Sequence, residues 1–176
     1  MTTSPAGRRH GLRVVVMGVS GSGKTTVGGG IAAALGLPFA DADDFHSPAN
    51  IAKMRAGQPL SDEDRLPWLE AIGTWLEERK AAVVTCSALK HSHRDRLRRH
   101  CPDAVFVFLS GPPELIARRQ AARQGHFMPA SLAGSQFATL EPPEAEEGAI
   151  TLDVSGPPEA VLERGLTALR KVVPGI

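Results

Sequence analysis

The sequence feature that most constrains this chain is the stretch GVSGSGKT at residues 18–25, which fits the pattern G-x-x-x-x-G-K-[ST] at every fixed position. A β-branched run at residues 14–16 precedes it, and an alanine-rich helical stretch at residues 31–35 follows it. Glycines let consecutive backbone N–H groups face one anion, and the following helix adds the positive end of its dipole. The pattern in this context predicts a loop that binds the phosphates of a nucleoside triphosphate.

The polar members of this loop have distinct expected partners. Lys24 is expected to reach the β- and γ-phosphates and to act in catalysis, and the Thr25 hydroxyl is expected to ligate Mg²⁺. We predict nucleotide contacts at Gly18, Ser20, Gly21, Ser22, Gly23, Lys24, Thr25 and Thr26. A triphosphate site can serve motion, signalling or transfer of phosphate to a small acceptor, so the loop alone does not decide the function.

The rest of the chain predicts one α/β domain. A chain of 176 residues with 42% hydrophobic and 22% charged residues is ordinary for a single globular domain with a sizeable core. We expect strands near residues 12–17, just before Asp41, and near 81–86, 104–109 and 149–153. They alternate with helices expected near residues 24–35, 48–55, 64–80, 91–100, 112–125, 131–140 and 157–173. This alternation indicates a parallel sheet with helices on both faces.

Charge, cysteine content and hydropathy limit which binding partners and which cellular compartment we expect for this protein. The formal charge of +1 gives no reason to expect a nucleic-acid or membrane partner, and two cysteines suggest no disulfide framework. Residues 1–11, which we interpret as a disordered tail before a domain at 12–176, lack the apolar run of a signal peptide. We therefore expect a cytoplasmic protein. The basic run at residues 90–100 lacks interleaved aromatic residues, which favours a solvated helix over a nucleic-acid surface.

A cluster of carboxylates follows the short second strand. Asp41 and Asp43 are two residues apart on a segment that we expect to be extended, so their side chains would face the same way. Ligands of parallel sheets lie at the carboxyl ends of the strands, beside the phosphate loop. Asp41 is therefore a candidate for the Mg²⁺ shell, and Asp43 for accepting a proton or hydrogen bond from an acceptor hydroxyl. The alternative is an acidic turn that caps the following helix.

Three arginines, Arg118, Arg119 and Arg123, precede a short loop at residues 126–129. Arginines on a segment that closes over the site can stabilise a transferring phosphoryl group, and we predict this role for Arg118 and Arg123. Arg119 and Arg123 share a helix face, whereas Arg118 points elsewhere, so at most two of them can line one site. The alternative for each is a solvated helix face. Because no acid ends the strand at 81–86, a small kinase is favoured over a motor ATPase.

Further segments carry a more specific signal: DADDFH at 41–46, NIAKM at 50–54, GQPL at 57–60, DEDR at 62–65, PWL at 67–69, CSALK at 86–90, RD at 94–95, GHFMP at 125–129 and SQFATLE at 135–141. In this order, and together with the loop, they make residues 14–169 resemble the bacterial-type gluconokinases. These are P-loop sugar-acid kinases related in fold to shikimate and nucleoside-monophosphate kinases.

The resemblance implies both a fold and a reaction. The fold is a three-layer α/β P-loop domain with a five-stranded parallel sheet in the order 2-3-1-4-5 and a small lid near residues 118–135. The reaction is ATP-dependent phosphorylation of D-gluconate at its 6-hydroxyl, giving 6-phospho-D-gluconate and ADP. Two other hypotheses stay open: a kinase for another small hydroxy acid such as shikimate, and a nucleotide-binding regulator without turnover. A homodimer is compatible with the resemblance, because members of this family are often dimeric.

The resemblance also implies roles for individual residues. Asp43 would orient and deprotonate the 6-hydroxyl, and adenine would lie near Arg118 and the loop at 154–157. Gluconate combines hydroxyls with one carboxylate, and the candidate substrate contacts are Asp43, His46, Lys53, Arg55, Lys90, Arg94, His126 and Gln136. Among these, Lys53, Arg55, Lys90 and Arg94 are the candidates for the carboxylate. Glycines at 28–30 and 134 depart from the better helix formers or polar residues that we would expect there.

Overall fold

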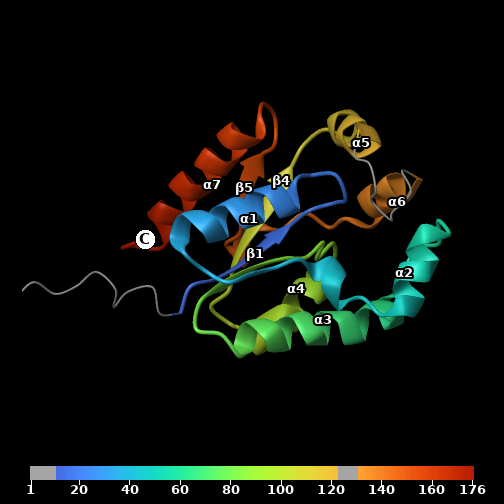
Figure 1. Cartoon of the computed structure of the whole chain (residues 1–176), viewed down its shortest axis with the longest axis horizontal. Helices are drawn as coiled ribbons and strands as arrows, with labels where there is room; N and C mark the ends of the chain where they lie inside the picture. The colour runs from blue at the N-terminus through green and yellow to red at the C-terminus, as the bar shows by residue number, and fades with distance from the viewer. Residues whose placement is uncertain (1–10, 123–130) are drawn as a thin grey trace, which may run out of the picture.

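The sheet has five parallel strands in the order that the family resemblance implied (Figure 1). The structure, a computed structural model, describes residues 11–122 and 131–176, with the side chains of residues 131–133 left out. The strand order is β2-β3-β1-β4-β5, and every neighbouring pair is parallel. The strands are β1 (Arg13–Met17), β2 (Phe39–Ala40), β3 (Ala82–Thr85), β4 (Val105–Ser110) and β5 (Ile150–Asp153).

Helices cover both faces of this sheet, so the three-layer arrangement is confirmed. The helices are α1 (Lys24–Leu35), α2 (Pro48–Arg55), α3 (Asp62–Glu77), α4 (His91–His100), α5 (Pro113–Ala122), α6 (Ser131–Thr139) and α7 (Pro158–Val172), with short 3₁₀ turns η2 (Ala42–Phe45) and η3 (Ala145–Glu147). Helices α1 and α7 lie on one face, and α3 and α4 on the other (Figure 1). In the described residues, no helix is both long and apolar enough to cross a membrane.

The alternation of side chains along β1 explains why both faces are covered. Val14 and Val16 belong to the core cluster under α1 and α7, whereas Val15 and Met17 belong to the cluster under α3. All four side chains are fully buried. A central parallel strand whose successive residues face opposite sides needs apolar side chains at every position, which is why this segment reads as a continuous hydrophobic run.

Two of the unexpected glycines in α1 are explained by close packing. A Cβ at position 28 would lie 3.1 Å from both Phe39 Cε2 and Thr85 Cγ2, and a Cβ at position 30 would lie 2.7 Å from Leu162 Cδ2. The glycines at 28 and 30 therefore let α1 approach the sheet and α7 more closely than alanine would. A Cβ at 29 would meet a single atom at 4.0 Å, and nothing within 4 Å surrounds position 134, so the structure explains neither of these glycines.

Helix α3 begins at Asp62, two residues before the predicted start. Ser61 caps it, because the Ser61 hydroxyl accepts a hydrogen bond from Asp64 N while the Asp64 carboxylate accepts one from Ser61 N. This reciprocal capping satisfies two backbone donors at the helix start. It also fixes the rotation of the first turn, which matters for the site below.

The expectation that the basic run at residues 90–100 forms a solvated helix is wrong for the inner face of α4, where His93 and Arg94 are buried. The side chain of Glu147 is only 4% exposed and pairs with Arg94 and Arg98 on α4. On the other side of α4, His100 and Arg96 pair with Glu70 on α3. Much of the positive charge of α4 is thus neutralised inside the fold.

Candidate active site

The phosphate loop connects β1 to α1 with the backbone that its glycines predict. Gly21 and Gly23 have φ angles of 84° and 96°, a region in which a side chain would be strained. The Lys24 ammonium lies over the loop and donates to the carbonyls of Gly18 and Val19, each at 3.0 Å. The first turn of α1 follows directly, so backbone N–H groups, a helix N-terminus and one ammonium converge where an anion would bind.

Two helices from the second half of the chain contact Ser20 in this loop. Ser20 N donates to Gln136 Oε1 of α6 at 2.6 Å, and Gln120 Nε2 of α5 donates to Ser20 Oγ at 3.1 Å. Gln136, a predicted substrate contact, therefore lies directly at the phosphate loop. Gln120 is a buried polar residue that the sequence analysis missed, and its position on the inner face of α5 was the available signal.

Asp41 links the loop to the candidate base. Thr25 Oγ1 donates to Asp41 Oδ2 at 2.6 Å, and Asp43 N donates to Asp41 Oδ1 at 3.0 Å. The predicted extended segment is wrong here, because Asp41 caps the 3₁₀ turn η2 and Asp43 lies inside that turn. Both side chains nevertheless line one cleft, while Asp44 is exposed. For this acidic segment we considered two alternatives, a helix cap and a position beside the phosphate loop. Asp41 caps the turn η2 and also lies beside the loop.

The cleft extends from the phosphate loop to α2 and α3. Its described lining residues are Ser20, Gly21, Lys24, Thr25, Asp41, Ala42, Asp43, His46, Met54, Pro59, Leu60, Arg65, Trp68, Thr85, Ser87, Ser135 and Gln136. The loop supplies one wall, and side chains of the α2–α3 region supply the opposite one. The structure thus brings together Lys24, Thr25, Asp41, Asp43, His46 and Gln136 from the predicted set.

His46 is held as a neutral ring in this cleft. It stacks on Trp68 with a centroid distance of 4.4 Å and an interplanar angle of 8°, and its Nδ1 lies 3.4 Å from Asn50 Nδ2. Burial lowers the pKa of His46 to about 4, and the charge of Arg65 contributes in the same direction. At neutral pH the ring can therefore donate or accept a hydrogen bond but carries no charge.

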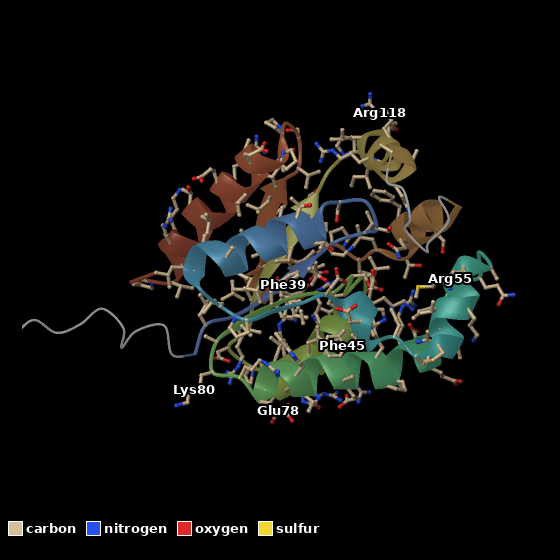
Figure 2. All side chains as sticks on the ribbon, viewed as in Figure 1. Phe39, Phe45, Arg55, Glu78, Lys80 and Arg118 are labelled. Atoms are coloured by element: carbon tan, nitrogen blue, oxygen red, sulfur yellow. The ribbon has the colours of Figure 1, made fainter. Side chains whose placement is uncertain are left out.

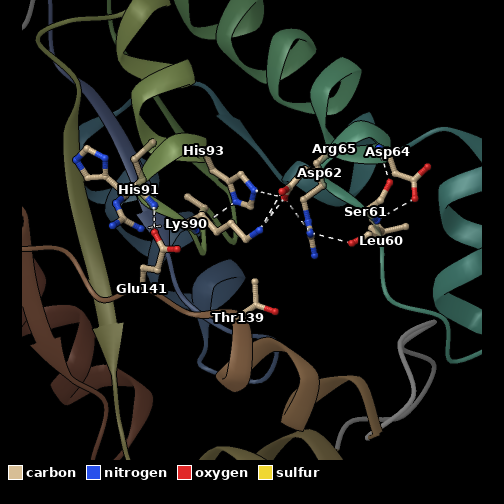
Figure 3. A network of polar contacts seen from close by, with 12 residues as sticks. Leu60, Ser61, Asp62, Asp64, Arg65, Lys90, His91, His93, Thr139 and Glu141 are labelled. Carbon is tan, nitrogen blue, oxygen red and sulfur yellow. Dashed lines mark hydrogen bonds and ion pairs between the residues drawn. The ribbon is translucent and has the colours of Figure 1, made fainter.

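Arg65 lines the cleft from the first turn of α3, a position that we did not predict from the sequence. Its side chain is 12% exposed, and Nη1 donates to Leu60 O at 2.9 Å and lies 3.9 Å from Asp62 Oδ1. Figure 3 shows the guanidinium between Leu60 and Asp62. The available signal was helical spacing, because Arg65 shares the buried face of α3 with Leu69 and Ile72.

The cations that we predicted for the substrate carboxylate lie elsewhere, and none of the four lines the described part of the cleft. Lys53 binds Asp64 at 2.9 Å, which lowers the pKa of that carboxyl to about 2. Lys90 binds Asp62 at 2.9 Å beside His93 (Figure 3).

Two of these predictions are corrected outright by the structure. Arg55 is exposed and points away from the body of the molecule (Figure 2). Arg94 is fully buried in the interior, where its guanidinium binds Glu147 and the carbonyl of Ala88. Neither position is compatible with a direct contact to a substrate in the cleft.

A second cavity lies on the other side of the phosphate loop. Its described lining residues are Gly21, Ser22, Gly23, Thr25, Thr26, Val27, Arg119, Pro158 and Val161. Arg119 Nη2 donates to Gly156 O at 2.9 Å. Arg118, which we predicted beside the nucleotide, does not line this cavity, because it is exposed and points outward (Figure 2), whereas its neighbour Arg119 does line it. The predicted residues Arg123 and His126 lie outside the described residues.

Fold and site together define a small P-loop kinase, and a model of the shikimate kinase family matches residues 20–140. The chain is 49% identical over 154 residues to the gluconokinase of Gluconobacter oxydans, covering 85% of this chain and 86% of that protein. It is 47% identical to the thermosensitive gluconokinase of Escherichia coli, over 78% of this chain and 75% of that one.

The chain belongs to the gluconokinase family, a family of ATP-dependent kinases. The solved structure of a gluconokinase from Sinorhizobium meliloti superposes with a TM-score of 0.87 at 48% identity. The match covers 94% of this chain and 95% of that one. The resemblance drawn from the sequence segments is confirmed.

Proposed function

We propose that this protein transfers the γ-phosphoryl group of ATP to the 6-hydroxyl of D-gluconate, giving 6-phospho-D-gluconate and ADP. The observation that carries the proposal is the arrangement of the cleft. The phosphate loop lies at one end with Asp43 beside it, and one partly buried cation, Arg65, lines the α2–α3 side. Gluconate has the matching layout, with a reacting hydroxyl at one end and a single carboxylate at the other. The likeness to proteins named gluconokinases supports the same substrate.

The phosphates and the base of the nucleotide occupy different places beside the phosphate loop. Its phosphates lie on the N–H groups of residues 18–25, and its base lies in the second cavity between Arg119 and Pro158, where a guanidinium plane can stack on it. Exposed Thr25 and Thr26 face this cavity from the first turn of α1. The lid arginine Arg123 is a further candidate for contact with the phosphates.

Thr25 and Asp41 fit a Mg²⁺ site. Their oxygens lie 2.6 Å apart at the start of α1, and Mg²⁺ prefers a few protein oxygens completed by phosphate oxygens and water. Within the described residues, no group of three or more His, Cys, Asp and Glu side chains could hold a metal by itself, which agrees with such a sparse set. When bound, Mg²⁺ neutralises charge on the β- and γ-phosphates.

Asp43 is the residue that we propose for the acceptor hydroxyl. Its backbone N–H donates to Asp41, which accepts a hydrogen bond from Thr25 at the start of α1, so the backbone of Asp43 is tied to the phosphate loop, and its side chain lines the same cleft. From there it can accept the proton of the 6-hydroxyl as that oxygen attacks phosphorus. Because phosphoryl-transfer transition states are loose, most of its contribution is to orient the hydroxyl.

Arg65 is the residue that we propose for the carboxylate of gluconate. A guanidinium offers a planar pair of donors that matches a carboxylate, and partial burial strengthens the interaction. Neutral His46, Ser87 and Gln136 line the space between the two ends and can bind the intermediate hydroxyls. An entirely apolar cleft would offer no hydrogen-bonding partners to the hydroxyls of a polyol, whereas these side chains do.

An acceptor panel tests the proposal. ADP production from Mg²⁺-ATP is measured with gluconate, other aldonates, shikimate, nucleoside monophosphates and no acceptor. We expect turnover that depends on gluconate, and a product whose phosphorus couples to the C6 protons in a ¹H–³¹P correlation spectrum. Turnover that depends on shikimate, or hydrolysis that needs no acceptor, would contradict the proposal.

A further inference from the structure

Ala88 has an unusual backbone conformation next to the cleft. Among the described residues it is the one non-glycine residue with a positive φ, 45°, and its side chain is fully buried. It directly follows Ser87, which lines the cleft. The left-handed conformation brings an alanine Cβ close to a carbonyl oxygen, and such strain persists only where the surroundings hold it. Some part of the structure must therefore hold Ala88.

Three successive carbonyls around Ala88 are each bound by a different segment of the chain. Ser87 O accepts a hydrogen bond from Gly18 N, the first residue of the phosphate loop, at 3.3 Å. Ala88 O accepts one from Arg94 Nη1 at 2.8 Å, and Leu89 O accepts one from Glu141 N at 2.7 Å. The left-handed residue is what turns these carbonyls in different directions. Arg94 is thus the side chain that donates a hydrogen bond to the strained residue itself.

Arg94 is in turn held by Glu147, which lies 53 residues further along the chain. Arg94 Nε and Nη2 donate to the two carboxylate oxygens at 2.7 and 2.9 Å, and the two side chains are 1% and 4% exposed. Burial alone would raise the pKa of Glu147, but hydrogen bonds from Arg94 and Arg98 outweigh it and hold the pKa at about 2. The Glu147 carboxylate is therefore ionised at neutral pH.

Stability alone does not account for such a pair. The cost of removing two charges from water commonly cancels their attraction, so an apolar pair of similar volume would serve stability as well. What an apolar pair would not supply is a donor to Ala88 O. We propose that Arg94, oriented by Glu147, is a positioning residue that keeps Ala88 in its left-handed conformation and thereby fixes Ser87 between the substrate cleft and the phosphate loop. The proposal rests on the proposed function for its readout.

Glycine substitution separates positioning from stability, because glycine adopts positive φ without the Cβ penalty. The experiment compares the wild type with Glu147→Gln, Ala88→Gly and the double variant, measuring kcat, KM and Tm for each. We expect Glu147→Gln to lower kcat/KM for gluconate by about tenfold, in line with the usual size of backbone strain. In the double variant, kcat/KM recovers by at least half of that loss on a logarithmic scale, while Tm does not recover.

Arg13→Gln supplies a matched control at the opposite end of β1. Arg13 donates to the carbonyls of Leu76 and Arg79 at the end of α3, so its loss lowers Tm without touching the cleft. We expect its kcat/KM to stay within about twofold of the wild type. If Glu147→Gln does not fold, Arg94→Lys replaces it in the same scheme, because lysine keeps the charge and loses the two-pronged contact.

Any one of three results would overturn the proposal. Unchanged kcat/KM in Glu147→Gln, a double variant as slow as the single one, or an equal loss in Arg13→Gln would each leave Arg94 and Glu147 with a structural role alone. Failure of the proposed function would look different, since the wild type itself would then not phosphorylate gluconate. In that case the same comparison is made with the acid that the wild type does phosphorylate, and the same outcomes decide it.

Discussion

The two halves of the cleft are built in different ways. The phosphate half comes from one stretch, residues 18–25, whose backbone and helix N-terminus form the site, with Thr25 bound to Asp41. The acceptor half gathers Asp43, Arg65 and Ser87 from three separate segments. A site made by consecutive backbone groups is specified locally, whereas a site made by side chains depends on how whole helices pack. The difference decides which parts of this protein the sequence alone reveals.

Long-range contacts hold the acceptor half together. Asn50 Nδ2 on α2 donates to Asp64 O on α3 at 3.0 Å, and Lys53 binds the Asp64 carboxylate. Trp68 Nε1 donates to Ala42 O at 2.8 Å and stacks on His46. Lys53, which we predicted to bind the substrate, thus joins α2 to α3 instead. Of the described cations on α2 and α3, Arg65 is the one that lines the cleft.

The largest effect should come from the phosphate half. Lys24→Ala removes the ammonium that lies over the loop, and we expect kcat to fall by about 10³-fold, as for other groups that stabilise developing charge. Because Lys24 is partly exposed, Tm should change little. Steady-state kinetics beside a thermal melt checks both. Retained activity would refute the assignment of the loop as the phosphate site.

A smaller loss of kcat should follow from substitution of Asp43, which lies where the phosphate half and the acceptor half of the cleft adjoin. Asp43→Asn keeps the shape of the side chain and removes the proton acceptor, so we expect kcat to fall by about 10²-fold. Binding of ATP, measured by calorimetry, should be retained. Asp44→Asn is the matched control, because Asp44 is exposed in the same turn. If the two variants had equal kcat, Asp43 would not be the acceptor's partner.

Substitution in the acceptor half should change KM for gluconate more than kcat. Arg65→Gln removes a charged hydrogen-bond donor, so we expect KM for gluconate to rise by about 10- to 100-fold with a smaller change in kcat. KM for ATP should stay near its wild-type value. Arg99→Gln, on the exposed face of α4, serves as a control that should leave both constants within about twofold. A rise seen with Arg55→Gln and absent with Arg65→Gln would restore the hypothesis drawn from the sequence.

The smallest effect concerns pH. His46 has a pKa of about 4 in the folded protein, against an ordinary value near 6.5, so the unfolded chain binds the proton more readily. The stabilisation linked to neutral His46 is therefore complete above pH 6.5 and is lost as the pH falls toward 4. An NMR titration should show the ring unprotonated at pH 5.5, and urea unfolding should show that His46→Gln loses this pH dependence. Protonation of His46 near pH 6.5 would contradict the account.

The same division explains which predictions succeeded. The parallel sheet and the loop follow from the alternation of elements and a contiguous motif, the strand order follows from the family resemblance, and the position of Asp43 in the cleft follows from its place after a strand. Arg65 was missed because an arginine on the buried face of a helix reads as a break in the apolar pattern. Arg94 was misplaced because its partner, Glu147, is 53 residues away, and no local pattern joins them. Arg118 was preferred over Arg119, and one residue along a helix turns the side chain by about 100°.

The most direct test of this account is a crystal structure with gluconate and a non-hydrolysable ATP analogue bound together. The account predicts the gluconate carboxylate within hydrogen-bonding distance of the Arg65 guanidinium, and the 6-hydroxyl between the Asp43 carboxylate and the γ-phosphate. A carboxylate bound instead by Lys53 or Lys90, or a substrate lying in the reverse direction with its carboxylate at Asp43, would contradict it.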